Sequence, residues 1–305
     1  MGRVGVDLYP QQSGLPLAEV KTFAKSLGGS PTNVAVGAAR YGHSAAVITK
    51  VGDDGFGLYV RKALREFGVD DRYVGTDAEL RTPVVFCEIF PPDHFPILFY
   101  REPKAPDMNL RVEELDLDAV RSARIFWTTG TGLSDEPSRS ATLAALAARA
   151  RSSITVHDLD YRPAFWASGE EARRHQREAL RYATIAVGNR EEVSVAVGEG
   201  EPEDLAGRLL EEGMEMAIVK LGRKGVLVAW PGGMAQVAPV EVEVVNGLGA
   251  GDAFGAALCH GLLLGWEPSR TIRFANAAGA YVAARLACAD AMPEEAQVRE
   301  LLGDG

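Results

Sequence analysis

The chain has 305 residues, 47% of them hydrophobic, which is enough to bury a large core in about two domains or one large α/β domain. A net charge of −10 and a pI near 5.1 argue against a general nucleic-acid surface, because phosphate binding needs clustered lysine and arginine. Cys87, Cys259 and Cys288 are odd in number and lack C-x-x-C spacing, which predicts buried free thiols. Without a signal-peptide pattern or an apolar run of roughly 18 residues, we expect a cytoplasmic protein with no nucleic-acid or membrane partner.

The amino-terminal third predicts two helices among short strands. Residues 8–27 contain Pro10, Gly14 and Pro16, and we expect them to be irregular. Two β-rich segments separated by a proline-rich turn predict a hairpin further along the chain. The expected elements are the end of a shortened buried strand at 3–7, a helix at 34–41, a strand at 45–51, a helix at 56–67, and hairpin segments at 82–90 and 97–101.

From residue 120 onward, short apolar strands alternate with helical segments. This alternation is typical of a parallel sheet covered by helices on both faces. In such sheets, ligands bind at the carboxyl ends of the strands. The expected strands are 125–129, 154–158, 185–188 and 217–220, and the expected helices are 139–151, 170–182 and 203–213.

A glycine-rich turn carries the clearest chemical signal. A strand expected at 241–245 leads into Asn246-Gly-Leu-Gly-Ala-Gly-Asp252 and then into an apolar helix reaching Leu264. The glycines at 247, 249 and 251 allow consecutive N–H groups to point into one concavity at the positive end of the helix dipole, which predicts an anion hole.

Asp252 stands out beside this turn. A carboxylate there repels a bound phosphate unless it has a chemical task, such as taking the proton from a hydroxyl that attacks phosphorus. The alternative is that Asp252 only caps the helix. A dinucleotide fingerprint would need a glycine at this position, and no G-x-x-x-x-G-K-[ST] motif occurs, so neither a Rossmann nor a P-loop phosphate site is predicted.

Together these motifs resemble the ribokinase-like carbohydrate kinases, also called phosphofructokinase B-type, across essentially the whole chain. The resemblance implies one kinase domain over 1–305, a three-layer α/β/α fold with a mostly parallel central sheet, and a small β lid formed by about 8–27 and 82–106. It also implies ATP and Mg²⁺ as cofactors, a small sugar as substrate, and a possible homodimer through the lid.

The resemblance also implies roles for individual residues. Asp252 would be the catalytic base, beside an oxyanion hole formed by Gly249, Ala250 and Gly251. Glu192, in the N-x-x-E motif that begins at Asn189, would hold Mg²⁺ largely through water. The sugar would contact Asp7, Gly28, Gly29 and Asn33, and the nucleotide would contact Asn189, Lys220, Gly222, Gly225, Asn246, Gly247 and Asn276.

Several of these motifs also have a purely structural explanation. Residues 28–33 and 189–192 both have the sequence of a helix start, and the small residues of 274–280 suit tight helix packing. The family commonly has Asp and Thr at the positions of Asn246 and Gly247, where they help to bind a monovalent cation. The segment 287–291 also lacks the usual Gly and Ser, so the sequence leaves potassium activation undecided.

Within the family, the closest resemblance is to kinases of the sugar acid 5-dehydro-2-deoxygluconate in inositol catabolism, which phosphorylate its terminal 6-hydroxyl. It rests on residues 2–10, 86–92, 158–163 and 245–252. A sugar acid needs a cationic partner, and Arg101 and Arg162 are the candidates, although either arginine can instead form a surface ion pair. The alternatives are a 2-keto-3-deoxygluconate kinase, another sugar kinase of the family, or a non-catalytic sugar-acid sensor.

Overall fold

The computed structural model describes residues 1–304, and its internal contacts divide this part of the chain into two compact units. Unit 1 comprises Met1–Gly2, Leu110–Pro239 and Glu267–Arg273. Unit 2 comprises Arg3–Asn109, Val240–Trp266 and Phe274–Gly305, of which the last residue is not described. No helix within residues 1–304 combines the length and apolar character that crossing a bilayer requires.

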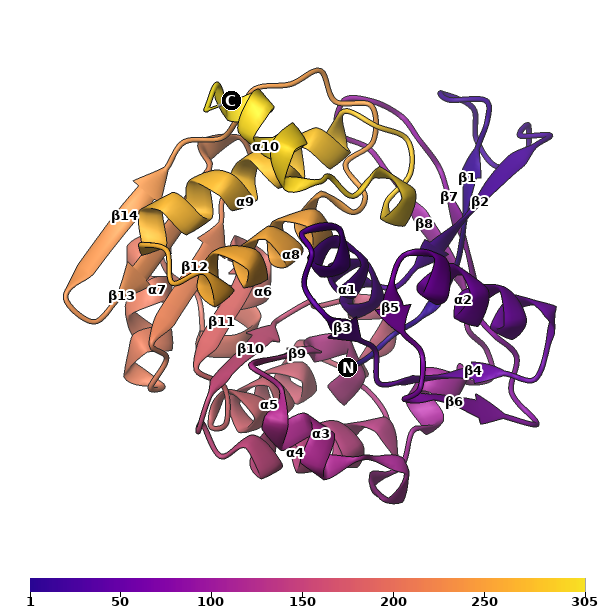
Figure 1. The fold of residues 1–305 in the computed structure, drawn as a ribbon, viewed down its shortest axis with the longest axis horizontal. Helices are drawn as coiled ribbons and strands as arrows, with labels where there is room; N and C mark the ends of the chain where they lie inside the picture. The colour runs from indigo at the N-terminus through magenta and orange to yellow at the C-terminus, as the bar shows by residue number, and fades with distance from the viewer. Residues whose placement is uncertain (305) are drawn as a thin grey trace. The chain divides into compact units, whose positions relative to one another are not determined.

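Unit 1 is built on a six-stranded sheet in the order β14-β13-β12-β11-β10-β9, drawn in magenta to orange in Figure 1. β9 to β12 are parallel, and β13 and β14 extend one edge as antiparallel strands. The strands are β9 (Ile125–Thr129), β10 (Ile154–Asp158), β11 (Ile185–Asn189), β12 (Met216–Lys220), β13 (Val226–Trp230) and β14 (Gly233–Val237).

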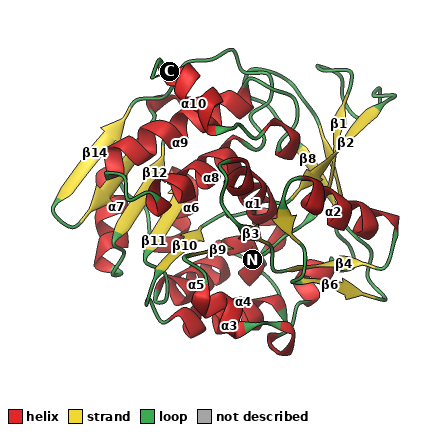
Figure 2. Ribbon diagram, in the orientation of Figure 1, coloured by secondary structure: helices red, strands yellow, loops and turns green. Residues whose placement is uncertain are grey.

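Helices alternate with the parallel strands of unit 1, as the sequence predicted (Figure 2). The central strands are almost entirely buried, and their apolar side chains pack with Leu180, Leu205 and Leu209 from the helices. Each such leucine stabilises the fold by about 1.5–3 kcal/mol. The helices are α3 (Leu117–Ser122), α4 (Ser138–Arg149), α5 (Gly169–Leu180), α6 (Arg190–Val197) and α7 (Pro202–Glu211).

Unit 2 contains a four-stranded sheet in the order β2-β1-β7-β8. β1 (Gly5–Pro10) pairs antiparallel with β2 (Phe23–Gly28) and parallel with β7 (Val84–Cys87), which pairs antiparallel with β8 (Ile97–Tyr100). The pairing of β7 with β8 confirms the predicted hairpin. Two small parallel pairs complete the strands: β3 (Ala45–Ala46) with β5 (Val69–Asp70), and β4 (Thr49–Gly52) with β6 (Val74–Asp77).

The helices of unit 2 include a closely packed pair. A β-carbon added to Gly37 of α1 would lie 2.4 Å from Cβ of Ala256 in α8, so only a glycine allows this approach. The helices are α1 (Ser30–Arg40), α2 (Gly55–Glu66), α8 (Ala250–Leu263), α9 (Pro268–Ala283), whose residues from Phe274 onward belong to this unit, and α10 (Glu295–Leu302). Short 3₁₀ helices in the two units cover Pro106–Asn109, Val112–Glu114, Gly130–Leu133, Pro163–Phe165, Gly222–Lys224 and Ala289–Ala291.

Four sequence-based boundaries were wrong. The first strand runs from Gly5 to Pro10 rather than over 3–7, and β2 begins within the stretch 8–27 that we expected to be irregular. The strand expected at 45–51 is split because β3 and β4 pair with different partners. Residues 241–245 form no strand, and the backbone N–H of Val245 instead donates to the carbonyl of Ala283, at 2.9 Å.

His157 is buried in unit 1, where its ring nitrogens contact two polar side chains and the charge of Asp160 also acts on it. Its Nδ1 lies 2.9 Å from Thr128 Oγ1, and its Nε2 lies 2.7 Å from Gln176 Oε1. Burial is the largest influence and lowers the pKa of His157 to about 4. In the folded protein the imidazole of His157 therefore stays neutral at pH values where the same imidazole in the unfolded chain, with a pKa of about 6.5, is protonated.

We expect this histidine to make stability depend on pH. The stability that comes from its neutral form is fully present above the pKa of the unfolded chain and falls as the pH drops toward the pKa of the folded protein. Lowering the pH from about 7.5 to about 5 should therefore reduce the free energy of unfolding by about 2 kcal/mol. Urea unfolding of the His157→Gln protein at both pH values should lack this component. His94→Gln, at an exposed histidine, is the control, and an equal pH dependence in both variants would contradict the prediction.

Candidate functional site

The glycine turn in unit 2 leads directly into α8. Gly249 is the N-cap and has a φ of 81°, a left-handed conformation that favours glycine. A side chain at Gly249 would also collide with Cys288, whose Sγ lies 2.4 Å from the position of an added β-carbon. The turn therefore presents bare backbone at the positive end of a 14-residue helix, which is the arrangement expected of an anion hole.

Asp252 lies in the first turn of α8 and is not its N-cap. Its backbone N–H donates to Gly249 O at 3.1 Å, and its side-chain Oδ2 accepts a hydrogen bond from Asn33 Nδ2 at 2.7 Å. The alternative in which Asp252 only caps the helix is therefore wrong. Packing of α1 against α8 brings together two predicted site residues that are 219 positions apart.

Asn33 retains an unused hydrogen-bonding group. The residue is 2% exposed, and its Oδ1 accepts no hydrogen bond from the residues that the structure describes. Buried acceptors in proteins normally have a donor. A ligand hydroxyl would supply one while Nδ2 remains bonded to Asp252, so this observation fits a sugar at Asn33.

Asp7 lies beside the two predicted glycines. A β-carbon added to Gly28 would lie 2.1 Å from Asp7 Oδ1. Gly29 has a φ of 101°, and a β-carbon added to Gly29 would lie 2.4 Å from Arg3 O. Both glycines are therefore required by close approach, as well as by the helix start that follows them. The structure thus gathers Asp7, Gly28, Gly29, Asn33 and Asp252 in unit 2.

The environment of Asp7 alters its acidity. Burial raises its pKa to about 7, and the negative charge of Asp252 acts in the same direction. The Arg3 guanidinium and a 3.3 Å hydrogen bond donated by Tyr9 Oη oppose the rise in pKa. Asp7 is therefore partly protonated near neutral pH, and it can both donate and accept a hydrogen bond.

Arg101 is not in a surface ion pair. Its guanidinium binds both carboxylate oxygens of Asp107, and the two side chains are 10% and 1% exposed. Asp107 also accepts a hydrogen bond from Val4 N at 2.9 Å, so the pair fastens the end of β8 to the residues before β1. Arg101 has a buried structural role, and this role accounts for its position without a ligand.

In unit 1, the predicted residues Asn189 and Lys220 and the unassigned Asp158 lie at the carboxyl ends of adjacent parallel strands. Asp158 ends β10, Asn189 ends β11 and Lys220 ends β12. Because these strands are neighbours in the sheet, the three residues share one edge. Burial raises the pKa of Asp158 to about 7, Lys220 opposes the rise, and Glu192 and Asp160 add to it.

Arg162 follows β10 at the same edge. Its Nη2 lies 3.1 Å from Asp160 Oδ1, and its side chain is 43% exposed, whereas that of Asp160 is 4% exposed. Thr131 Oγ1 donates to the other oxygen of Asp160 at 2.9 Å. The carboxylate of Asp160 is thus held on both sides, and the side chain of Arg162 that pairs with it is partly accessible to solvent.

The N-x-x-E motif forms a helix start. Asn189 Oδ1 accepts from Glu192 N at 2.9 Å, and Glu192 Oε2 accepts from Asn189 N at 2.6 Å, the reciprocal pattern of a capping box. Glu192 is 5% exposed. Within residues 1–304, no three histidine, cysteine or acidic side chains are grouped to hold a metal ion. The capping box agrees with the helix start that the sequence also allowed, and Mg²⁺ binding by this motif stays a prediction.

The loop after β12 contains two glycines with positive φ. Gly225, with a φ of 84°, is required by packing, because an added β-carbon would lie 2.0 Å from Val237 O. Gly222, with a φ of 58°, is exposed and has no atom within 4 Å of an added β-carbon among the described residues, so space beside it remains open. Asn276 is half-buried on α9 in unit 2.

Four residues near these groups were not assigned by sequence reasoning. The sequence could have indicated Asp158 as a site residue, since it ends the expected strand 154–158 just before the candidate Arg162. Tyr9 Oη lies 2.6 Å from Cys288 Sγ, and the ring of Phe95 lies 2.9 Å from the position of a β-carbon on Gly247. These contacts connect distant parts of the chain, so no local sequence pattern indicates them.

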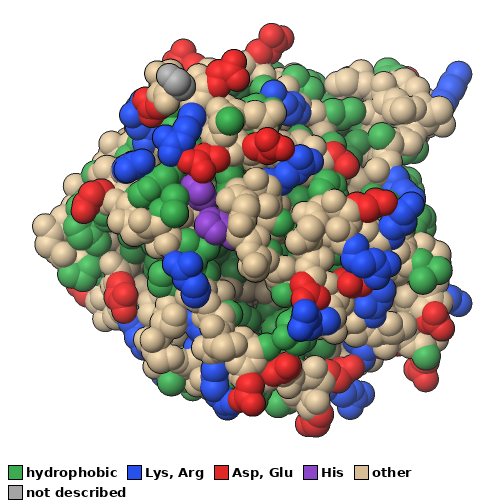
Figure 3. All heavy atoms as spheres, viewed as in Figure 1, with side chains coloured by type: hydrophobic (Ala, Val, Ile, Leu, Met, Phe, Trp, Pro, Cys, Tyr) green, Lys and Arg blue, Asp and Glu red, His purple; other side chains and the backbone are tan. Residues whose placement is uncertain are grey.

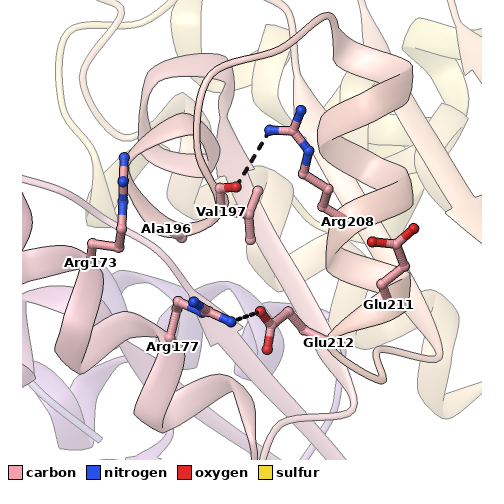
Figure 4. Close-up of a pocket in the computed structure, with 7 residues that line it drawn as sticks. All are labelled: Arg173, Arg177, Ala196, Val197, Arg208, Glu211 and Glu212. Atoms are coloured by element: carbon pink, nitrogen blue, oxygen red, sulfur yellow. Dashed lines mark hydrogen bonds and ion pairs between the residues drawn. The ribbon is translucent and has the colours of Figure 1, made fainter.

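A separate hollow of about 470 Å³ on unit 1 is lined by three arginines and two glutamates (Figure 4). Arg177 pairs with Glu212 at 2.6 Å, and Arg208 donates to Glu199 O at 2.7 Å. Arg173 donates to Val195 O at 2.9 Å, near the end of α6. These arginines satisfy helix-end carbonyls and an acid, so we assign the hollow no ligand. On the face shown in Figure 3, acidic and basic side chains are intermixed.

Comparison with known proteins gives one consistent family. The family described as "pfkB family carbohydrate kinase" matches residues 1–295. A 5-dehydro-2-deoxygluconokinase of Shouchella clausii is 34% identical over 307 residues, covering 99% of this chain and 94% of the relative. A protein of the same name from Photobacterium profundum is 35% identical, covering 96% of this chain and 90% of the relative.

Solved structures agree with this family. The crystal structure of a PfkB protein from Polaromonas sp. JS666 has a TM-score of 0.84 at 26% identity and covers 95% of this chain and 96% of its own. A fructokinase of Vibrio cholerae, solved with fructose, ADP and calcium, has a TM-score of 0.87 at 25% identity, covering 99% and 97% of the two chains. The predicted ribokinase-like fold, with its mostly parallel central sheet, is confirmed.

Proposed function

Because the chain belongs to the pfkB family of carbohydrate kinases, we propose that it transfers the γ-phosphoryl group of ATP to the 6-hydroxyl of 5-dehydro-2-deoxygluconate. The names of the relatives support this substrate, as do the sequence motifs. The observation that carries the proposal is Asp252, held by Asn33 in the first turn of a helix that begins at a glycine turn. Such a step belongs to inositol catabolism.

The proposed mechanism assigns each group in unit 2 a task. Asn33 Nδ2 fixes the Asp252 carboxylate, which accepts the proton of the 6-hydroxyl as its oxygen attacks phosphorus. The N–H groups of Gly249, Ala250 and Gly251 stabilise negative charge on the transferred phosphoryl group. Asp7, Gly28, Gly29 and the unused Oδ1 of Asn33 bind sugar hydroxyls.

We propose nucleotide contacts separately for residues of each unit. In unit 1, Lys220, Gly222 and Gly225 would contact the phosphates. In unit 2, Gly247 would contact the phosphates, with Asn246 shaping the turn and Asn276 beside the base. Glu192 and Asn189 would hold Mg²⁺ through water, and this ion supplies neutralisation of the phosphate charge. Glu192 is buried and lies close enough to Asp158 to act on its pKa, which supports this assignment.

Replacing the base tests the mechanism. We expect Asp252→Asn to lower kcat by at least about 100-fold, since general base catalysis contributes roughly 10²–10⁴ in rate. Sugar binding, measured by calorimetry, should change little because the amide keeps the shape of the carboxylate. Asp118→Asn is the control, at a side chain that is 94% exposed. A variant with wild-type turnover would exclude Asp252 as the base, and binding without turnover in the wild type would favour the sensor alternative.

Arg162 is the proposed reader of the substrate carboxylate, because it is partly exposed at a ligand-binding edge whereas Arg101 is buried against Asp107. We expect Arg162→Gln to raise KM for 5-dehydro-2-deoxygluconate by about 10-fold or more, as charge-assisted bonds contribute about 1.5–3 kcal/mol. The KM for ATP should stay nearly constant.

Arg177→Gln is a matched control, since Arg177 is also exposed and ion-paired. The assay should compare 5-dehydro-2-deoxygluconate, 2-keto-3-deoxygluconate, fructose and ribose. Preference for a neutral sugar in the wild type would remove the substrate assignment, and preference for 2-keto-3-deoxygluconate would favour the alternative sugar acid.

We further propose that residues 8–27 and 82–106 form a lid, and that a second copy of the chain covers its sheet. Phe95, between β7 and β8, contacts Gly247 of the turn, which supports the lid. β8 is an edge strand, and Leu98 and Tyr100 on it are 48% and 61% exposed. Unpaired edges and exposed apolar side chains favour association.

Light scattering tests this dimer. We expect a mass of two 32.6 kDa chains for the wild type and of one chain for Leu98→Glu, because the added charge would be buried in the interface. Leu58→Glu on α2, at a leucine that is 71% exposed, is the matched control. Equal masses for the two variants would place any interface elsewhere.

A further inference from the structure

Asn246, the first residue of the glycine turn, is completely buried in unit 2. Its Nδ2 donates to the carbonyl oxygen of Leu286 at 2.6 Å, and its Oδ1 accepts from Leu248 N at 3.0 Å. Its backbone N–H donates to Ala283 O at 3.0 Å. One side chain therefore satisfies a backbone acceptor outside the turn and a backbone donor within it.

These contacts fix the turn against the segment 283–288. Cys288, two residues after Leu286, lies against Gly249. A β-carbon added to Gly249 would lie 2.4 Å from Cys288 Sγ. The turn is thus attached at Asn246 and packed at Gly249, on either side of Leu248. The N–H groups at the start of α8 can be aimed at an anion only while this loop keeps its shape.

The hydrogen bond between Asn246 and the carbonyl of Leu286 does not suit a cation bound between these two groups. A monovalent cation needs oxygen ligands, whereas Asn246 presents an N–H donor to Leu286 O at hydrogen-bonding distance. A carboxylate at this position would instead put two oxygen atoms together and would need a positive charge to hold them.

We propose that the Asn246 amide positions the anion hole, and that this hydrogen bond makes the turn independent of monovalent cations. Asn246 is a positioning residue, because it acts through the backbone of residues 248–251 and not through its own contact with the reacting atoms. The effect on turnover rests on the proposed kinase function, whereas the effect on the stability of the turn does not.

The test is Asn246→Asp, which keeps the size of the side chain and replaces the donor by an oxygen. Melting temperature and ATP turnover are measured in potassium chloride and in tetramethylammonium chloride at equal ionic strength. In the wild type we expect both quantities to be the same in the two salts. In Asn246→Asp without potassium we expect a lower melting temperature and turnover reduced by up to about 100-fold, the loss that removing a direct anion-hole donor would cause.

Potassium should raise the melting temperature of Asn246→Asp and recover at least about 10-fold of its turnover, as expected if one positioned cation replaces the lost donor. Asn246→Ala is the control, since it removes the donor without adding a carboxylate and should gain nothing from potassium. A wild type that potassium activates or stabilises would overturn the proposal, and this measurement remains decisive if Asn246→Asp does not fold. Equal behaviour of Asn246→Asp in both salts would also overturn it.

The two readouts separate this inference from the proposed function. If the wild type transfers no phosphoryl group while the melting temperatures follow the expected pattern, the kinase proposal fails and the amide attachment stands. If turnover is normal but requires potassium in the wild type, the kinase proposal stands and the cation independence that we assign to the Asn246 amide is wrong.

Discussion

The close contact between α1 and α8 is the constraint on which the site in unit 2 depends. Gly37 and Ala256 leave no room for a larger side chain between the helices, and this approach brings Asn33 to 2.7 Å from Asp252. Either residue alone is an ordinary polar group on a helix. Together they form an oriented carboxylate beside an open acceptor, so the chemistry of the site follows from the packing of two small residues.

The acidic groups of the two units show how burial tunes this kind of site. Asp7 and Asp158 lie in different units, yet burial raises the pKa of each to about 7, and in each case another carboxylate adds to the shift. A nearby cation, Arg3 or Lys220, limits the rise. At each position, burial therefore favours the neutral carboxyl group, and the nearby cation favours the charged carboxylate.

Much of this arrangement was predictable from the sequence, for definite physical reasons. The strands at 125–129 and 154–158 have the expected bounds because buried parallel strands are short apolar runs ended by polar residues. The motifs that contain Gly28, Asn33 and Asp252 could be found in the sequence, and the roles that the family resemblance implies for these residues stay predictions. β2 and the missing strand at 241–245 were not predictable, because pairing depends on which distant segment is available. The burial of Arg101 by Asp107 likewise depends on tertiary contacts that no local pattern encodes.

The buried thiols were predicted, and their positions have a practical meaning. All three cysteines are free and buried, and burial raises the pKa of each, to about 12 for Cys259. Alkylating reagents attack the thiolate, so the folded protein resists them. Cys288 differs from the other two because it packs against Gly249 in the turn that begins α8. Its rate of labelling is consequently tied to how often that turn opens, and the chain carries its own chemical probe of loop dynamics.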